Sequence, residues 1–540
     1  MSRLRKAEWG AALLLTFLVF CLHLMAATSV GPLWRDEANT VALATLPGFG
    51  DVWRNLQFDS FPMLWLLIVR CIVAVFGPMN DAVFRGVGFL IGMGLVASLW
   101  FIARSFGHSL PLVSLALLGM SPSMIRWGDS IRAYGFGILL ILVTCALLWR
   151  FVDQASWRRF AVATIVAIAS VHALYYNAVL LLAFCAGAAA VGAHRRAWKT
   201  VALVLVIGLI AAVSLVPYRA TIQAASSWNM LVQVPSYSLS WFWNSFARTV
   251  DVGWLELRFV WLGLLGAALA YGTFSLVSPR RVGLSARQYD VMLFFVVSLV
   301  VGVPGSILFL RLLSYHTAPW YYLTLMALAS VCVDGILGAG IHGSRLRVLR
   351  LAGVVTLAAA AFVPTRQVVR MRMSDADLVA AKIHELARPG DLVVVAPWYY
   401  GISFGRYYRG ATDWMTVPPL PLNGFHRYDL LKLEMIRADQ TAPARAVMTR
   451  AEDALSRGHR VFVAGFLAEP WSGAPVRILT PATSSAQLMS ANQYETQWSM
   501  MVGEALFRHA MIRRYMPIEA DRVINPVENL SLQVLEGWRR

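Results

Sequence analysis

The sequence predicts a polytopic α-helical membrane protein followed by a C-terminal α/β soluble domain. Of its 540 residues, 58% are hydrophobic and 14% are charged. Soluble domains are usually less apolar and more charged, with roughly 45–50% and 25% of such residues. Apolar runs of about 20 residues, long enough to cross a bilayer, recur from residue 8 to residue 364 and then stop. We therefore expect a transmembrane domain over residues 1–365 and a soluble domain over residues 366–540.

The excess of positive charge fits membrane topology better than binding to nucleic acid. The formal net charge is +18, and most of it lies in residues 1–365, where arginines flank the apolar runs as the positive-inside rule predicts. We expect membrane lipids, and no nucleic acid, as partners of this half. All five cysteines lie inside apolar runs, so neither a disulfide framework nor a zinc site is indicated.

The apolar runs predict about 11 membrane spans. The first, over residues 8–27, follows a basic flank and is interpreted as an uncleaved anchor, because so many spans follow it. The others are expected near 83–103, 109–125, 135–152, 160–175, 176–193, 200–217, 256–278, 289–310, 319–340 and 350–364.

Segment 61–77 is the difficult case, because it is near the lower length limit for a span and carries Arg70 at its centre. If it does not cross, the N-terminus is cytoplasmic and every dense basic loop lies on the cytoplasmic side. If it crosses, all of these loops but the first move to the outer face, against the positive-inside rule. We therefore expect an interfacial or re-entrant helix here, and an extracytoplasmic C-terminal domain.

The C-terminal part alternates between helical and strand patterns. Residues 375–388 have helical spacing and are followed by the β-branched run 391–396. The same step recurs from 444–458 into 460–464. This alternation predicts an α/β layer, and no nucleotide-binding glycine motif is present in it.

Acidic side chains gather in the loop after the first span. Asp36 and Glu37 are adjacent there, and Asp59 stands three residues before Pro62. Carboxylates at the membrane surface can act as general bases or hold a divalent cation. They can equally cap the first turn of an interfacial helix. The spacing alone leaves both hypotheses open.

A second cluster lies in the short outer link between two spans. It brings Asp129, Arg132 and Tyr134 within six residues. Arginine can bind a phosphate through two hydrogen bonds, and Asp129 could face the Asp36 region. The alternative is an interfacial turn with a Trp/Tyr belt and snorkelling arginines.

Two further groups are expected on the same outer face. His172 lies at the outer end of a span, where it is either functional or held by a structural hydrogen bond. Arg311 and His316 precede the aromatic run 320–322 and suit a lipid phosphate, although an aromatic belt explains most of this pattern too.

Taken in order, these pieces resemble the GT-C superfamily of membrane glycosyltransferases, in particular the branch of the protein O-mannosyltransferases and lipid A aminoarabinose transferases. The resemblance covers about residues 1–340. It is carried by the Asp36-Glu37 pair, the Asp-x-x-Pro of Asp59–Pro62, Arg85, the 129–134 loop, His172, and the Arg311/His316 loop before Pro319.

The resemblance implies a hexosyl- or pentosyltransferase of the bacterial inner membrane that takes a sugar from a polyprenyl-phosphate donor, with inversion. It assigns the general base to Asp36, supported by Glu37. Arg132 and Tyr134 would hold the donor phosphate, helped by Arg311 and His316. Asp59 and Asp129 match positions that bind a divalent metal in some members only; no other cofactor is implied. The acceptor could be a glycan, a lipid or a protein.

A membrane transporter or flippase for envelope glycolipids is the main alternative. Transporters commonly show paired repeats and helices broken near the midplane, and their charges line a path through the membrane. Here the polar clusters collect at one surface and no two-fold hydropathy repeat is visible. A non-catalytic scaffold and a ligase of lipid-linked oligosaccharides fit the early acidic loop less well.

Overall fold

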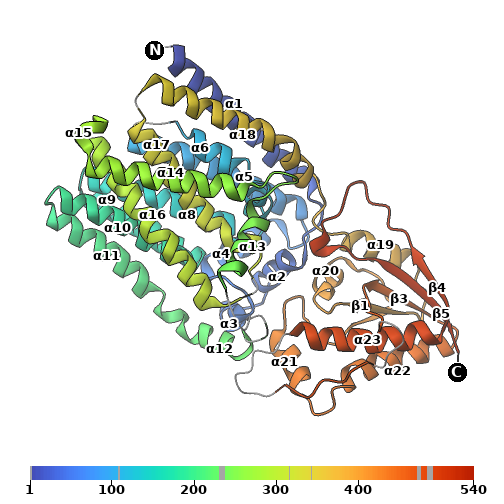
Figure 1. The fold of residues 1–540 in the computed structure, drawn as a ribbon. Coiled ribbons are helices and arrows are strands. Elements are labelled where there is room, and N and C mark those ends of the chain that lie inside the picture. Colours follow the sequence, from blue (N-terminus) through green and yellow to red (C-terminus); the bar gives the residue numbers. More distant parts are fainter. Residues whose placement is uncertain are drawn as a thin grey trace.

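The computed structural model describes residues 3–107, 110–229, 231, 238–315, 317–341, 343–470, 476–482 and 491–539. A bundle of long helices carries the N-terminal part of the chain, and a small sheet covered by helices follows it (Figure 1). In the described part, nine helices are long and apolar enough to cross a membrane. The chain is therefore a multi-pass membrane protein, as the sequence predicts.

These nine candidates share a length of 18 residues or more. Seven of them are single helices: α1 (Arg3–Ser29), α5 (Asp81–Phe106), α8 (Ala133–Asp153), α10 (Asn177–His194), α14 (Leu257–Val277), α16 (Ala286–Leu313) and α18 (Ser344–Val369). The other two are α11 (Trp198–Ser214) continued by α12 (Arg219–Asn229), and a turn at Pro319–Tyr322 continued by α17 (Leu323–Gly340).

Two of the predicted spans form shorter or broken helices, which is why nine helices rather than eleven meet that length. α9 (Trp157–Ala173) has 17 residues. The 109–125 segment becomes α6 (Leu112–Ser114), a wide helical turn (Leu115–Gly119) and α7 (Pro122–Gly128). Proline cannot donate a backbone hydrogen bond inside a helix, so Pro122 starts a new helix instead of continuing the old one.

The predicted interfacial helix is α4 (Met63–Phe76), which at 14 residues is too short to count as a span. It packs on α2 (Arg35–Ala44). Arg70 donates to the carbonyls of Ala44 at 2.9 Å and Leu46 at 2.6 Å, where α2 ends. A cation at the carbonyl end of a helix satisfies its unpaired acceptors and its dipole. This contact explains how a charged residue is accommodated at the centre of an apolar segment.

The remaining helices of the bundle lie in its connections. They are α3 (Phe49–Asn55) in the first loop, α13 (Leu239–Val250) in the long connection after α12, and the short α15 (Pro279–Val282).

The C-terminal part contains a five-stranded mixed sheet with the order β2-β1-β3-β5-β4. Its strands are β1 (Leu392–Ala396), β2 (Asp413–Thr416), β3 (Arg460–Gly465), β4 (Ala510–Met516) and β5 (Leu532–Trp538). β1 runs parallel to both β2 and β3, with Val394 opposite Met415 and Val463. β5 is antiparallel to β3 and β4.

Helices cover both faces of this sheet (Figure 1). They are α19 (Ala376–Leu386), α20 (Tyr400–Tyr407), α21 (Tyr428–Ile436), α22 (Ala442–Ser456) and α23 (Ala491–His509). Val393 and Val395 belong to one hydrophobic cluster and Val394 to another, because successive side chains of a strand point to opposite faces. The predicted α/β layer is confirmed, and the predicted helix-to-strand steps are α19 into β1 and α22 into β3.

The sheet-bearing part attaches to the loop after α1. Met373 N, just beyond α18, donates to Val30 O at 2.7 Å. Arg406 of α20 pairs with Asp81 at the start of α5 at 2.6 Å. The first loop is therefore enclosed between the bundle and the C-terminal part.

Candidate active site

α2 presents the two adjacent acids of the first loop in its first turn, where the helix dipole favours negative charge. Trp34 N donates to Glu37 Oε2 at 3.3 Å. Glu37 thus caps the helix, whereas Asp36 takes no part in the cap. The two sequence hypotheses for this pair, a helix cap and a reactive acid, therefore apply to different members of it.

Glu37 is fully engaged in structural contacts. Arg85 of α5 binds it through two hydrogen bonds of 2.6 and 2.9 Å, and Ile131 N donates to it at 2.9 Å. A buried charge pair is tolerated when its remaining hydrogen-bonding capacity is also satisfied. Glu37 consequently fixes α2, α5 and the loop before α8 relative to one another.

Asp36 faces a different set of groups. His426, from the loop before α21, lies 3.2 Å from its Oδ1, and Arg35 Nε lies at 3.6 Å. Burial alone would raise the pKa of Asp36, but the hydrogen bond to His426 and the charges of Arg132 and Arg35 outweigh it and hold that pKa well below its ordinary value. Asp36 is therefore an anionic acceptor across the neutral pH range, and its side chain keeps 19% exposure.

Arg132 lies beside Asp36 and is buried. Its Nη1 is 2.8 Å from Asp59 Oδ1, and it donates to Thr40 Oγ1 at 2.9 Å and to the Asp36 carbonyl at 3.2 Å. Phe61 lies 4.4 Å below the guanidinium, a distance typical of a cation–π contact. Although burial opposes the charge, Asp59 and Asp36 raise the pKa of Arg132, so it stays a cation.

One donor of this guanidinium is unused. Arg132 Nε is buried and has no hydrogen-bond partner among the described residues. A buried donor without a partner is costly, and a phosphate oxygen is a ligand that would satisfy it.

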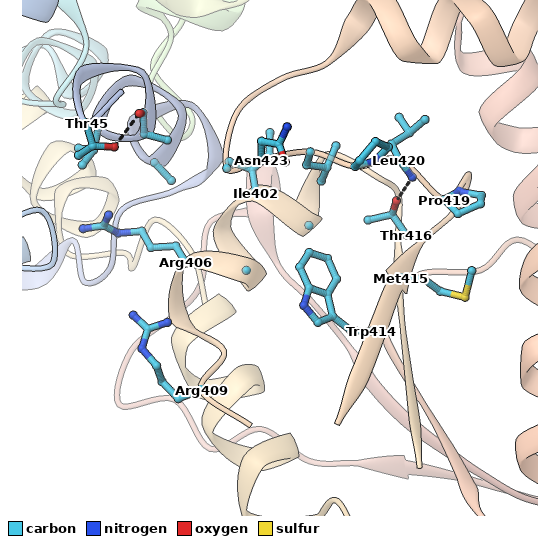
Figure 2. A pocket seen from close by; sticks show the side chains of 18 of the residues that line it. Thr45, Ile402, Arg406, Arg409, Trp414, Met415, Thr416, Pro419, Leu420 and Asn423 are labelled. Atoms are coloured by element: carbon cyan, nitrogen blue, oxygen red, sulfur yellow. Dashed lines mark hydrogen bonds between the residues drawn. The ribbon is translucent and has the colours of Figure 1, made fainter. Parts of the chain in front are cut away.

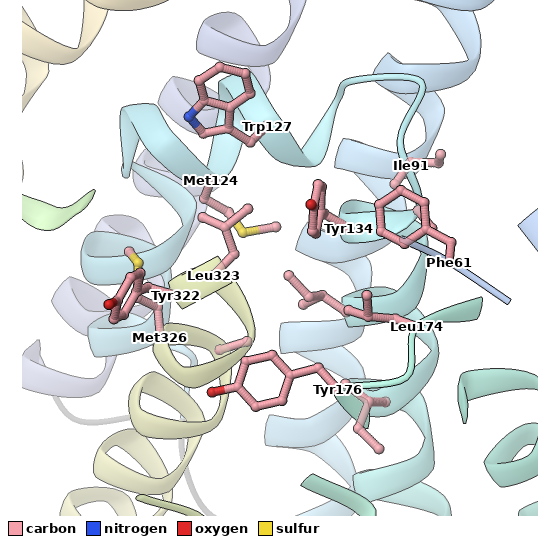
Figure 3. Close-up of a cluster of buried hydrophobic side chains, with 14 of the residues drawn as sticks. Phe61, Ile91, Met124, Trp127, Tyr134, Leu174, Tyr176, Tyr322, Leu323 and Met326 are labelled. Atoms are coloured by element: carbon pink, nitrogen blue, oxygen red, sulfur yellow. The ribbon is translucent and has the colours of Figure 1, made fainter. Parts of the chain in front are cut away.

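Aromatic side chains form a wall beside Arg132, and Figure 3 shows three of them, Phe61, Tyr134 and Trp127. The ring of Tyr134 packs edge-on against Phe61 at 4.9 Å and lies 6.5 Å from Tyr321. Trp127 continues the wall against Trp320 at 4.6 Å. Tyr134 is buried within this wall, beside the guanidinium rather than at an open surface.

Asp129 and His172 lie away from this group of side chains. Asp129 Oδ2 is 2.7 Å from His23 Nδ1 of α1, so the partner of Asp129 is a histidine of the first span rather than a group beside Asp36. His172 uses both ring nitrogens, at 3.1 Å to Tyr218 Oη and 3.0 Å to Ser214 Oγ. The contacts of His172 have the form of the structural hydrogen bond that the sequence left open as its alternative role.

The carboxylates do not fit a divalent cation. Within the residues that the structure describes, no three His, Cys, Asp or Glu side chains converge as a metal site. Asp59 pairs with Arg132 and Asp129 with His23, so each of the two expected ligands already has a partner of its own. A hard cation such as Mg²⁺ or Ca²⁺ needs several oxygens directed at one point.

The last two predicted residues lie near the end of α16. Arg311 is exposed in the final turn of that helix, and it makes no ion pair with Asp36. His316 lies outside the described residues.

His426 is the main site residue that the sequence did not indicate. Its backbone N donates to Asn39 Oδ1 on α2 at 2.8 Å, and its ring stacks on Tyr428 at 5.3 Å. The local sequence offers only a histidine in a loop that follows Phe425 and precedes Tyr428 by two residues. Such a pattern is too common to indicate a functional residue.

No protein-family model matches the chain, and no curated protein matches its sequence. Solved structures do match. The apo oligosaccharyltransferase of Archaeoglobus fulgidus aligns with a TM-score of 0.50 at 11% identity, over 85% of this chain and 69% of that one.

Two complexes align less closely. AglB from the same organism, with an inhibitory peptide and a dolichol-phosphate, gives a TM-score of 0.48 at 11% identity, over 86% of this chain and 70% of that one. ArnT from Cupriavidus metallidurans, bound to undecaprenyl phosphate, gives 0.44 at 13% identity, over 84% and 92%. The match to the oligosaccharyltransferase shows that the two chains share a fold, and this is the GT-C fold that the sequence resemblance predicts.

Proposed function

We propose that the chain is a glycosyltransferase that moves a sugar from a polyprenyl-phosphate donor to a hydroxyl group of a cell-envelope acceptor, on the outer face of the membrane. One observation carries the proposal. An ionised, partly exposed carboxylate, Asp36, and a buried guanidinium with an unused donor, Arg132, lie side by side at one end of an apolar bundle.

These two groups match the two requirements of the reaction. A base must take the proton of the incoming hydroxyl, and a cation must stabilise the departing phosphate. In the proposed step Asp36 accepts the hydroxyl proton while the acceptor oxygen bonds to C1 of the sugar. The bond from C1 to the phosphate oxygen breaks, and its electron pair leaves with the polyprenyl phosphate. A single displacement of this kind inverts C1.

The other side chains support this division of labour. His426 donates to Asp36 and fixes its orientation. Glu37 and Arg85 act as positioning residues, because they hold the turn that carries Asp36 without facing it. Tyr134 and Phe61 shield the guanidinium from water, which strengthens its attraction for a phosphate.

The charges of the bundle support an outer location of the site. Glu8, Arg347 and Arg350 pair at the start of α1 and α18. Glu8 and Ser29 are separated by about 30 Å of helix, so this basic cluster lies at the opposite end of α1 from Asp36. The positive-inside rule assigns the basic end to the cytoplasm.

One labelling experiment distinguishes a glycosyltransferase from a flippase. Membranes containing the protein are supplied with radiolabelled polyprenyl-phosphate sugars, and the label is followed. We expect label to leave the carrier, with release of polyprenyl phosphate, and a product of inverted anomeric configuration by NMR. Label that changes leaflet but stays on its carrier would support a flippase instead.

A further inference from the structure

A cavity lies beside α2 and is lined by residues of that helix and of the C-terminal part (Figure 2). It has a volume of about 720 Å³ and is lined on one side by α2 and on the other by α20, β2 and the 419–424 loop. Its α2 wall is made by small and apolar residues spaced three and four apart, namely Ala38, Val41, Ala42 and Thr45. Residues with this spacing share one helix face. Asp36 and Thr40, one turn apart, share the opposite face.

Trp414 of β2 forms the aromatic part of the opposite wall (Figure 2). Two glycines of α20 allow its ring to lie close to that helix. A Cβ at Gly405 would be 3.1 Å from the ring, and one at Gly401 would be 3.3 Å from it and 2.6 Å from Thr416. Side chains at these two positions would crowd the indole and fill part of the cavity.

The cavity also carries positive charge that is incompletely neutralised. Arg409 donates to the Tyr408 carbonyl and to Met79 Sδ, and no carboxylate among the described residues is recorded within ion-pair distance of it. Arg406 pairs with Asp81, but its buried Nε has no hydrogen-bond partner in the described part of the chain. Of these two guanidiniums, only that of Arg406 has a carboxylate partner among the described residues.

We propose that this cavity binds a saccharide that carries an anionic substituent, as part of the acceptor. Its volume lies within the roughly 300–1,000 Å³ typical of small-ligand sites. The apolar face of a sugar ring can stack on an indole, and guanidiniums recognise carboxylate and phosphate groups through paired hydrogen bonds. An aromatic platform beside two under-neutralised arginines provides both contacts.

The cavity is joined to the reactive end of α2 by one short loop. Residues 419–424 line the cavity, and His426 follows two residues later and contacts Asp36. A saccharide in this cavity would lie against the same helix and loop that orient the base. The assignment of the bound saccharide to the acceptor rests on the proposed function. The binding of an anionic saccharide in this cavity is independent of that function.

Calorimetry on the full-length protein in detergent, without any donor, tests the inference. The probes are a hyaluronan tetrasaccharide, which carries carboxylates, and mannopentaose 6-phosphate, each compared with a neutral partner, chitotetraose or mannopentaose. We expect at least one anionic probe to bind with a Kd of about 1 mM or tighter, and its neutral partner at least tenfold more weakly. The anionic probe that binds more tightly shows whether the substituent is a carboxylate or a phosphate.

Two variants locate the binding. Arg409→Gln removes an exposed cation of the cavity and should weaken the anionic probe at least tenfold. Arg445→Gln, a matched exposed arginine on α22 that pairs with Asp439, should leave binding unchanged. Equal affinity for neutral and anionic probes, unaltered binding in Arg409→Gln, or no binding of any probe would overturn the inference. Since no donor is present, each result stands whether or not transfer is observed.

Discussion

His426 and Asp36 are 390 positions apart in the chain, yet His426 Nε2 lies 3.2 Å from Asp36 Oδ1. An ionised carboxylate can only accept a hydrogen bond, so Nε2 carries the proton. The other ring nitrogen, Nδ1, is buried and has no partner among the described residues. The C-terminal part thus completes the site by holding the carboxylate that the first loop presents.

Replacing His426 should move the pH dependence of transfer. The hydrogen bond from His426 lowers the pKa of Asp36, so in His426→Ala that pKa rises and the carboxylate is protonated at a higher pH. The acid limb of kcat/KM should therefore shift upward in pH, with a smaller loss of rate at pH 8 than at pH 5. His384→Ala, an exposed histidine on α19, serves as control. An unshifted acid limb would contradict the pairing.

Arg132→Gln should raise KM for the donor and lower kcat, because the cation that meets the phosphate is lost. Removing one electrostatic stabiliser typically costs about 10²–10³ in rate. The substitution also leaves Asp59 as a buried, unpaired charge, at a cost of about 3–5 kcal/mol.

The double variant Asp59→Asn/Arg132→Gln separates these two effects. It should recover thermal stability while remaining inactive. If stability and activity recover together, Arg132 has only a structural role.

Glu37→Gln should destabilise the protein without changing the pH profile of transfer. It leaves Arg85 with a neutral partner in a buried place, and breaking a buried ion pair costs about 3–5 kcal/mol. Thermal unfolding and specific activity per folded protein are measured side by side. A changed pH profile in the folded fraction would show that Glu37 takes part in proton transfer.

Asp375 should make the C-terminal part less stable at high pH. Burial raises its pKa from 3.8 to about 6, so the folded protein binds the proton more tightly than the unfolded chain. Stability is then highest below pH 3.8, falls as the pH rises to about 6, and stays level above it. The loss is at most about 3 kcal/mol.

Asp375→Asn should remove this penalty, because the amide oxygen can still accept from Leu530 N, as the carboxylate does at 2.8 Å. We expect a higher Tm at pH 8 and a flatter dependence of Tm on pH between 4 and 6. Asp453→Asn, on the exposed side of α22, is the control. A Tm at pH 8 no higher than that of the unaltered protein would contradict the assignment.

Most of the helical architecture could be predicted because apolar length and arginine position are local signals. The short helix α4 also follows from them, because segment 61–77 is apolar but near the lower length limit for a span; its interfacial position stays a prediction. The breaks at Gly119 and Pro122 were missed because apolar residues flank residues 119–123 on both sides, although Ser121 and Pro122 are themselves a helix-start signal. In the sheet, β1 and β3 are buried, β-branched runs, whereas β4 (Ala510–Met516) is half exposed and rich in arginine and methionine, which carries no clear strand pattern.

The site could be predicted only as far as it is built from neighbouring loops. Asp36, Asp59 and Arg132 are indeed brought together. Asp129 is close to Arg132 in sequence, but the chain turns between them, and Asp129 instead contacts His23. His426 lies in a distant loop with no periodic pattern, so only the folded structure brings it to Asp36.

Transfer by Asp36→Asn tests the central claim most directly. The variant keeps the size of the side chain and can still pair with His426, but it cannot take a proton. Asp51→Asn, at a half-buried acid of the same loop paired with Arg54, is the matched control. At equal protein levels we expect Asp36→Asn to lose about 10²–10⁴ in rate, the range contributed by a general base, and Asp51→Asn to transfer normally. An Asp36→Asn protein that transfers label as fast as the control would contradict the account.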